Sequence, residues 1–185
     1  MKKTLTHLVV LIVISLAASG CIPTIQRQWD VQPVSGTIID GTTGKPVPGA
    51  TIRHREQPRL TARSDAQGHF HIDEQSHLGF HLLMPGSAMA TNTWDITHPD
   101  YPNGVAQTRT HFPPLDRQLS ELKIPLFAAL PSSPDTCPYF GYLMQWHHWH
   151  QATDNAGSKR LRQPMPLDDC KNDAARNELH NLWFN

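Results

Sequence analysis

The chain has 185 residues, a length that suits one compact domain with a short extension. Its 16 Lys and Arg residues balance 16 Asp and Glu residues without forming a basic run. Nucleic acid is therefore not an expected partner, because Lys and Arg supply most of the affinity for phosphate. The 16 prolines and 11 glycines interrupt every long helical period after residue 21, which favours a mainly β, loop-rich body.

The first 21 residues have the layout of a bacterial secretory signal. Lys2 and Lys3 precede an almost unbroken apolar run from Thr6 to Ala18, and small residues then lead to Cys21. This run is shorter than the roughly 20 residues that a membrane-spanning helix needs. The segment resembles a lipoprotein signal, which implies removal of residues 1–20 and attachment of lipid, palmitate included, at Cys21. Ordinary secretion and cleavage is the alternative.

The residues around the cysteine also predict a location. Cleavage would leave 14 basic and 16 acidic residues, a formal charge of −2, because Lys2 and Lys3 are removed and no acid is. Ile22, rather than Asp, follows the cysteine. Under the sorting rule of enteric lipoproteins this implies the outer membrane, facing the periplasm. Residues 21–33 contain two prolines and are expected to be a tether, spanning at most roughly 40 Å.

Short apolar stretches between turn residues predict a series of strands after this tether. Glycine and proline mark turns at 41–46 and 65–68. In the stretch His69-Phe70-His71-Ile72, the two apolar side chains share one face and the two histidines share the other. The expected strands cover 34–40, 47–54, 61–64 and 69–72.

These residues carry a family resemblance. The segment Ser35-Gly36-Thr37-Ile38, continued by Thr43-Gly44-Lys45-Pro46-Val47-Pro48-Gly49-Ala50 and by Ser64-Asp65-Ala66-Gln67-Gly68-His69-Phe70, resembles a carboxypeptidase regulatory-like domain. The resemblance implies a transthyretin-like (Ig-like) seven-stranded β-sandwich over residues 34–127. Trp94–Tyr101 would supply a later strand and turn, and Arg117–Leu126 the last strand. The stretch Ser76–Thr93 is longer than this family pattern requires.

Residues 128–185 lie outside the resemblance and are expected to form a short α-helical extension. A helix is expected over Tyr139–Thr153, because Tyr142, Trp146 and Trp149 recur at i, i+4 and i+7 and share one face.

A second helix is expected over Cys170–Trp183, capped by Asp168 or Asp169. If Cys21 is lipidated, Cys137 and Cys170 remain as an even pair. In an oxidising periplasm such a pair most often forms a disulfide, with two free buried thiols as the alternative.

Histidines in the first of these helices suggest a metal site as one hypothesis. His147 and His150 lie at i and i+3, and Asp154 lies about one turn further, so that they could bind zinc or copper. The favoured interpretation is instead a helix that packs its Trp face on the sandwich and exposes its His face. His69 and His71 could likewise form half a metal site, but a polar outer sheet face is favoured.

Aromatic residues of the extension suggest a second hypothesis. They either cover the sandwich, which is favoured, or form a patch for an envelope protein or a glycan, because Trp anchors many interfaces. The residues concerned are Trp146, Trp149, Trp183 and Phe184.

The sequence holds no nucleophile motif of the Gly-x-Ser-x-Gly or His-Glu-x-x-His kind. The expected function is therefore that of a non-enzymatic lipoprotein without a cofactor, bound to the membrane by lipid and serving as a structural or binding module. The alternative is a periplasmic metal-binding lipoprotein.

Overall fold

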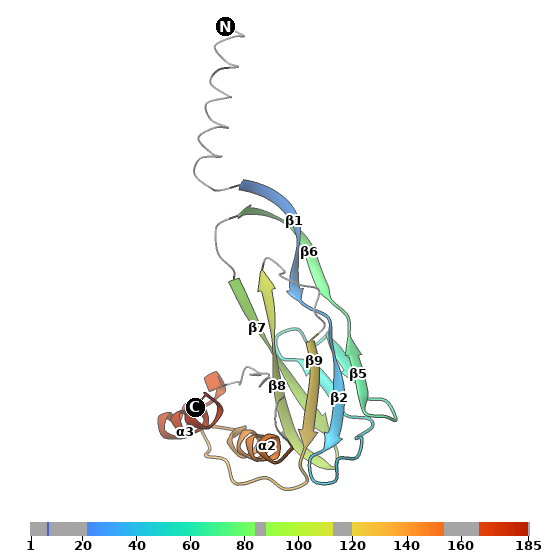
Figure 1. Ribbon diagram of the computed structural model, residues 1–185, viewed down its shortest axis with the longest axis vertical. Helices are drawn as coiled ribbons and strands as arrows, with labels where there is room; N and C mark the ends of the chain where they lie inside the picture. The colour runs from blue at the N-terminus through green and yellow to red at the C-terminus, as the bar shows by residue number, and fades with distance from the viewer. Residues whose placement is uncertain (1–6, 8–21, 84–87, 113–119, 154–166, 185) are drawn as a thin grey trace.

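The computed structural model describes residues 7, 22–83, 88–112, 120–153 and 167–184. Within these residues the fold is mainly β with two α-helices near the C-terminus, as expected (Figure 1). The strands are β1 (Ile22–Val31), β2 (Val34–Asp40), β3 (Thr51–His54), β4 (Thr61–Arg63), β5 (His69–Ile72), β6 (Gln75–Leu83), β7 (Ala88–His98), β8 (Tyr101–Phe112) and β9 (Ser120–Leu126). The helices are α2 (Phe140–Thr153), the short 3₁₀ helix η1 (Leu167–Asp169) and α3 (Asp173–Phe184).

Seven of these strands form two sheets, which together are called the body here. One sheet has the order β5-β2-β9, with β2 antiparallel to β5 and parallel to β9. The other has the order β4-β3-β7-β8 and is antiparallel throughout. Alternating side chains of both sheets join one buried apolar cluster, in which Ile38, Ile52, Trp94 and Ile124 are fully enclosed.

Two glycines of the motif, one inside β2 and one in a turn, each have a direct steric reason. A Cβ on Gly36 would lie 2.2 Å from the backbone oxygen of Leu122, so β2 and β9 can approach only with glycine there. Gly68 has φ +76°, a left-handed conformation that glycine adopts without strain. Phe70 then enters the core while His69 and His71 are exposed, which confirms the predicted faces of β5.

Residues 22–31, most of the expected tether 21–33, form a strand whose register shifts once between Trp29 and Val31. β1 pairs antiparallel with β6, and the two make a two-stranded ribbon whose register runs from Ile22↔Leu83 to Val31↔Gln75. Most of β6 comes from the stretch 76–93 that is longer than the family pattern requires. The ribbon projects from one end of the body (Figure 1), and Val31 at its base is fully buried in the core.

The first predicted helix is confirmed within one residue by α2. The second starts three residues later than predicted and is not capped by Asp168 or Asp169, which belong to η1. The side chain of Asn172 accepts a hydrogen bond from the backbone N–H of Ala175 at 3.0 Å, so it supplies the N-cap of α3. Among the described residues, neither helix has the length and apolar character needed to cross a membrane.

Candidate functional site

The predicted disulfide joins the two segments that precede the helices α2 and α3. Cys137 and Cys170 are bonded, with their Cα atoms 4.1 Å apart, and both are buried. The bond ties the segment before α2 to the end of η1. Cys21, the predicted lipidation site, lies outside the described residues.

The aromatic face of α2 lies against the body. The hydroxyl of Tyr142 donates to the backbone oxygen of Pro125 at 3.0 Å, and the ring meets Phe127 edge-on at 6.1 Å. Burial raises the pKa of Tyr142 above its ordinary value. Trp146 is only 2% exposed and contacts the rings of Tyr142 and Trp183. Trp146 is therefore a core residue and cannot be part of an exposed partner-binding patch.

The other aromatic residues of that hypothesis are less enclosed. Trp149 and Trp183 are half-buried and pack against the core. The Trp149 ring also lies 5.7 Å from Nζ of Lys123 on β9, which links α2 to the body. Phe184 ends α3, and its side chain lies outside the described residues.

The histidines of α2 lie beside the same aromatic group. The ring centres of His147 and His150 are 5.3 Å and 6.5 Å from that of Trp183, so the indole borders both imidazoles. Asp154 lies outside the described residues. Across the described part of the chain, no group of three or more His, Cys, Asp or Glu side chains is placed to hold a metal ion.

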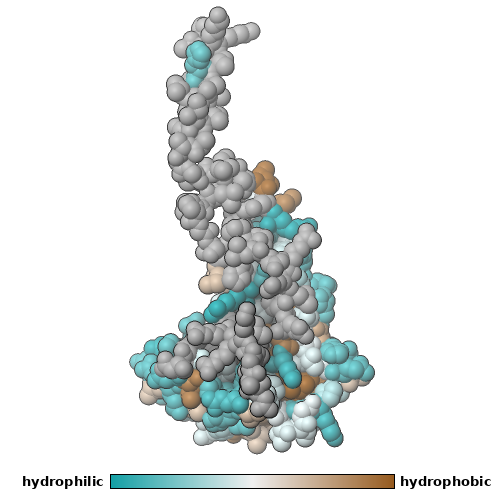
Figure 2. All heavy atoms as spheres, viewed as in Figure 1, coloured by the Kyte–Doolittle hydropathy of each residue, from teal (hydrophilic) through white to brown (hydrophobic). Residues whose placement is uncertain are grey.

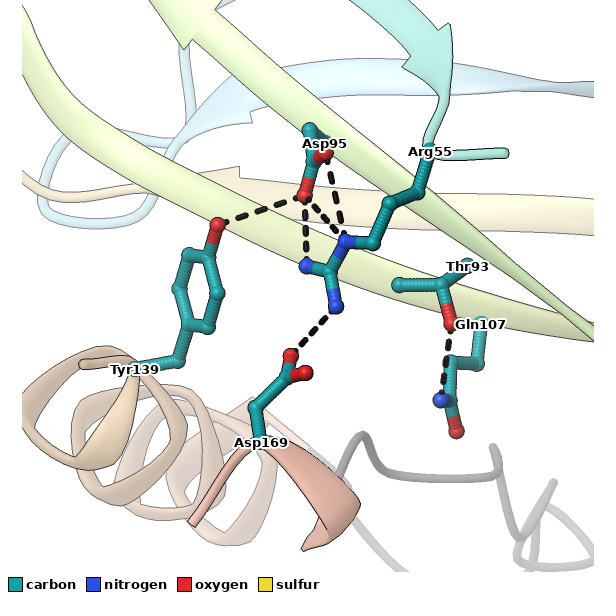
Figure 3. A network of polar contacts seen from close by, with 6 residues as sticks. All are labelled: Arg55, Thr93, Asp95, Gln107, Tyr139 and Asp169. Atoms are coloured by element: carbon teal, nitrogen blue, oxygen red, sulfur yellow. Dashed lines mark hydrogen bonds and ion pairs between the residues drawn. The ribbon is translucent and has the colours of Figure 1, made fainter. Parts of the chain in front are cut away.

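The outer face of β7 and β8 is where the extension meets the body. Asp95 points away from the core, since its neighbours Trp94 and Ile96 point inward. Val105, opposite Asp95 in the register, is nevertheless fully buried. On the same face Gln107 donates to the hydroxyl of Thr93 at 3.0 Å (Figure 3). The extension contacts this sheet face through Tyr139, which reaches Asp95.

A polar network fastens this contact (Figure 3). Arg55, just after β3, donates from Nη2 to Oδ1 of Asp95 at 2.6 Å and from Nε to both Asp95 oxygens at 3.2 and 3.3 Å. Its Nη1 donates to Oδ2 of Asp169 in η1. The hydroxyl of Tyr139 donates to Oδ1 of Asp95 at 3.2 Å, and its ring lies 5.6 Å from the guanidinium.

The surroundings of Arg55 and Tyr139 in the network raise their pKa values, so that the guanidinium stays charged and the phenol stays neutral. Hydrogen bonding to Asp95, with a smaller contribution from Asp169, raises the pKa of Arg55 against the opposing effect of burial. Burial and the charge of Asp95 raise the pKa of Tyr139. These side chains satisfy one another and fix the extension. The sequence contains no signal for the network, because Arg55 and Asp169 are separated by 114 residues.

A second group of hydrogen bonds joins the end of β2 to the first residue of β8. Oδ1 of Asp40 accepts backbone N–H groups of Thr42 and Thr43 at 2.9 and 2.6 Å, and Oδ2 accepts the Tyr101 hydroxyl at 2.8 Å. Desolvation acts to raise the pKa of Asp40, but the hydrogen bonds from Thr43, Tyr101 and Thr42 outweigh it and lower that pKa. The hydrogen bond to Asp40, with burial, raises the pKa of Tyr101 to about 12.

The ribbon carries the most exposed apolar side chains of the described residues. Ile25, Leu78 and Phe80 are 76%, 74% and 69% exposed. Two of them, Ile25 and Phe80, stand directly opposite each other in the register. Nothing in the sequence marked these residues, since the pairing of β1 with β6 was not foreseen.

Comparison with models of known families gives no match for this chain, and comparison with curated proteins gives none either.

Proposed function

We propose that the protein is a lipid-anchored, non-enzymatic lipoprotein of the bacterial cell envelope, and that its body is a structural or binding module. The observation that carries the proposal is the position of the ribbon. The first described strand begins at Ile22, immediately after Cys21, and the ribbon extends from the body toward that end of the chain (Figure 1). A lipid on Cys21 would therefore hold the ribbon at the membrane and the body beyond it.

The disulfide supports a location outside the cytoplasm. Disulfides persist in oxidising compartments such as the periplasm and are rare where thioredoxin and glutathione keep thiols reduced. The pair Cys137–Cys170 is buried within the extension, which is typical of a structural rather than a catalytic bond. The outer membrane, facing the periplasm, is the proposed site on the basis of Ile22.

The arrangement of the body is compatible with a transthyretin-like sandwich of the carboxypeptidase regulatory-like family. Sheets of three and four strands together give seven strands, with the close contact at Gly36 and the turn at Gly68 where the motif has them. On this proposal, the ribbon and the helical extension are additions to that sandwich. Such a scaffold hosts many tasks, so the fold does not name the ligand.

Radioactive palmitate labelling of the full chain expressed in an enteric bacterium tests the anchor. We expect label on the wild-type protein and none on Cys21→Ser, since the sulfur of Cys21 carries the lipid. The matched control is Cys137→Ser/Cys170→Ser, which removes the other two cysteines and should keep the label. Separation of inner and outer membranes then checks the location.

Two results would contradict the proposal. One is a wild-type protein without palmitate, and the other is a Cys21→Ser variant that stays in the outer-membrane fraction as fully as the wild type.

A further inference from the structure

The exposed apolar residues of the ribbon lie on one of its faces. Residues directly opposite each other in an antiparallel pair share a face, and residues two apart along a strand do too. Ile25 is opposite Phe80, and Leu78 is opposite Arg27, so all four lie on the same face. Figure 2 shows hydrophobic side chains gathered on the ribbon at the end remote from the body.

The other face of the ribbon is polar from residue 24 to residue 28, while the register places Ile22 opposite Leu83 on that same face at its far end. Gln28 and His77 stand opposite each other there, and Nδ1 of His77 lies 3.2 Å from Oδ2 of Asp30. Over residues 24–28 and their partners, the ribbon thus has an apolar-bearing face and a polar face. Among the described residues, four large apolar side chains are highly exposed, and three of them are Ile25, Leu78 and Phe80. Exposed apolar side chains grouped in this way are typical of a surface that binds an apolar partner.

We propose that this face, formed by Ile25, Leu78 and Phe80, lies on the phospholipid bilayer and inserts its side chains into the interface. The proposal rests on the proposed function, because the anchor at Cys21 brings the ribbon to the membrane. Four residues of fully extended chain span at most about 14 Å, so Ile25 cannot lie farther than this from a lipid-bearing Cys21. Leu78 and Phe80 are brought to the same end of the chain because they pair with Arg27 and Ile25 of β1.

The backbone of the ribbon limits how deep it enters. In the described part of the chain β1 and β6 form a two-stranded sheet, so each has an outer edge without a neighbouring strand. Unpaired backbone N–H and C=O groups are costly in hydrocarbon, which excludes immersion of the whole ribbon. The headgroup region, roughly 5–7 Å thick on each side of the hydrocarbon, still solvates these groups while apolar side chains reach past it.

A positive charge on the same face is consistent with a ribbon that lies in the headgroup region. Arg27 is exposed and lies next along the face after Ile25, with Nη1 3.1 Å from Oε1 of Glu74. Its aliphatic stem can cover apolar surface while the guanidinium stays among phosphate groups. The ribbon then acts as a second contact beside the lipid, and fixes the direction in which the body points away from the membrane.

Site-specific fluorescence on the full, membrane-extracted chain tests this orientation. With Cys21 lipidated and the other two cysteines bonded, a cysteine introduced at Leu78→Cys is the free thiol and takes a polarity-sensitive probe. The matched control is His77→Cys, its neighbour on the polar face. Each protein is reconstituted into phosphatidylethanolamine–phosphatidylglycerol vesicles containing a spin-labelled, quenching phospholipid, and is also exposed to aqueous iodide.

We expect the probe at residue 78 to emit at shorter wavelength, to be quenched by the lipid and to be protected from iodide. The probe at residue 77 should be quenched by iodide and little by the lipid. Phe80→Cys repeats the test should Leu78→Cys disturb the ribbon, and the Trp fluorescence of each variant verifies an intact body.

Three results would overturn the proposal: iodide quenching of both probes, equal lipid quenching of both, or protection of the residue 78 probe from lipid and iodide alike, which would indicate a protein partner or a second copy. Mass analysis of the Cys21 peptide in the same sample separates the two proposals. Missing lipid on Cys21 refutes the anchor. A chain of residues 22–185 carrying the residue 78 probe has neither the lipid nor the apolar run 6–18, so lipid quenching of this chain on the same vesicles would support the ribbon contact by itself.

Discussion

At the scale of single residues, the carboxylate of Asp40 makes the stability of the body depend on pH. Its pKa is lowered in the folded state from 3.8, so the ionised carboxylate contributes stability above the unfolded pKa. That contribution is lost as pH falls from about 4 toward the folded pKa. We expect Asp40→Asn to destabilise the protein by about 1–2 kcal/mol at pH 7, since it weakens hydrogen bonds to a partly exposed charge. Urea unfolding at pH 7 and at acid pH measures both effects.

The control for this variant is Asp73→Asn on the exposed surface, which should leave the stability at pH 7 unchanged. A second readout is the absorbance titration of Tyr101, whose pKa is about 12 in the wild type. In Asp40→Asn it should move toward the ordinary value of 10.0. An Asp40→Asn protein with the same acid dependence of stability as the wild type would contradict this account.

Single residues were predictable where the cause is local. Phe70 and Ile72 could be assigned to the core because alternation along a strand determines the face. The covering role of Trp146 followed in the same way from helical spacing. The partners of Arg55 could not be predicted, because they are 40 and 114 residues away and meet only after the extension folds back on β7.

At the scale of elements, Arg55 fastens the extension to the outer face of β7. The substitution Arg55→Met removes the guanidinium and leaves the carboxylates of Asp95 and Asp169 without the cation that they share. We expect a loss of about 1–3 kcal/mol, since hydrogen bonds between charged groups are among the stronger ones and these side chains are only partly exposed. Urea unfolding measures this loss, and hydrogen exchange should show earlier opening of α3 than in the wild type.

Arg53→Met is the matched control, because Arg53 lies two residues earlier on β3 and is exposed. It should change stability by no more than about 0.5 kcal/mol. Equal effects of the two substitutions would show that the Arg55 contacts do not fasten the extension.

Elements were predictable to the extent that their periodicity is continuous. β7 was expected only from Trp94 on, and β8 was not expected as a strand. The strands β2 to β5, β9 and helix α2 have such a continuous pattern. β1 does not, because Pro23 and the polar run 26–28 interrupt it, and its partner β6 is about 50 residues away along the chain. The start of α3 was misplaced because Asp168 and Asp169 are as good caps as Asn172 in sequence.

At the scale of the whole molecule, the body and the extension share one core, from which we expect a single folding unit. Ile38 of β2, Trp94 of β7, Trp146 of α2 and Leu179 of α3 belong to one continuous buried cluster. The sequence predicted a separate extension laid on the sheets, but could not show that the two share one core. The ribbon, by contrast, contributes only Val31 among its described side chains to this buried cluster, and the rest of its length projects from the body.

The disulfide is the covalent support of that single unit. It closes a loop between residues 33 apart, and by the chain-entropy relation such a loop stabilises the folded state by about 3–4 kcal/mol. We expect Cys137→Ser/Cys170→Ser to lose roughly this amount in urea unfolding, with the loss reproduced by a reductant acting on the wild type. Because the extension shares the core with the sheets, the double variant should still unfold in one transition followed equally by Trp fluorescence and by far-ultraviolet circular dichroism. Two separate transitions would contradict the single unit. An unchanged urea midpoint in the double variant would instead mean that the Arg55 contacts and the packing of Trp146 hold the extension without the covalent bond.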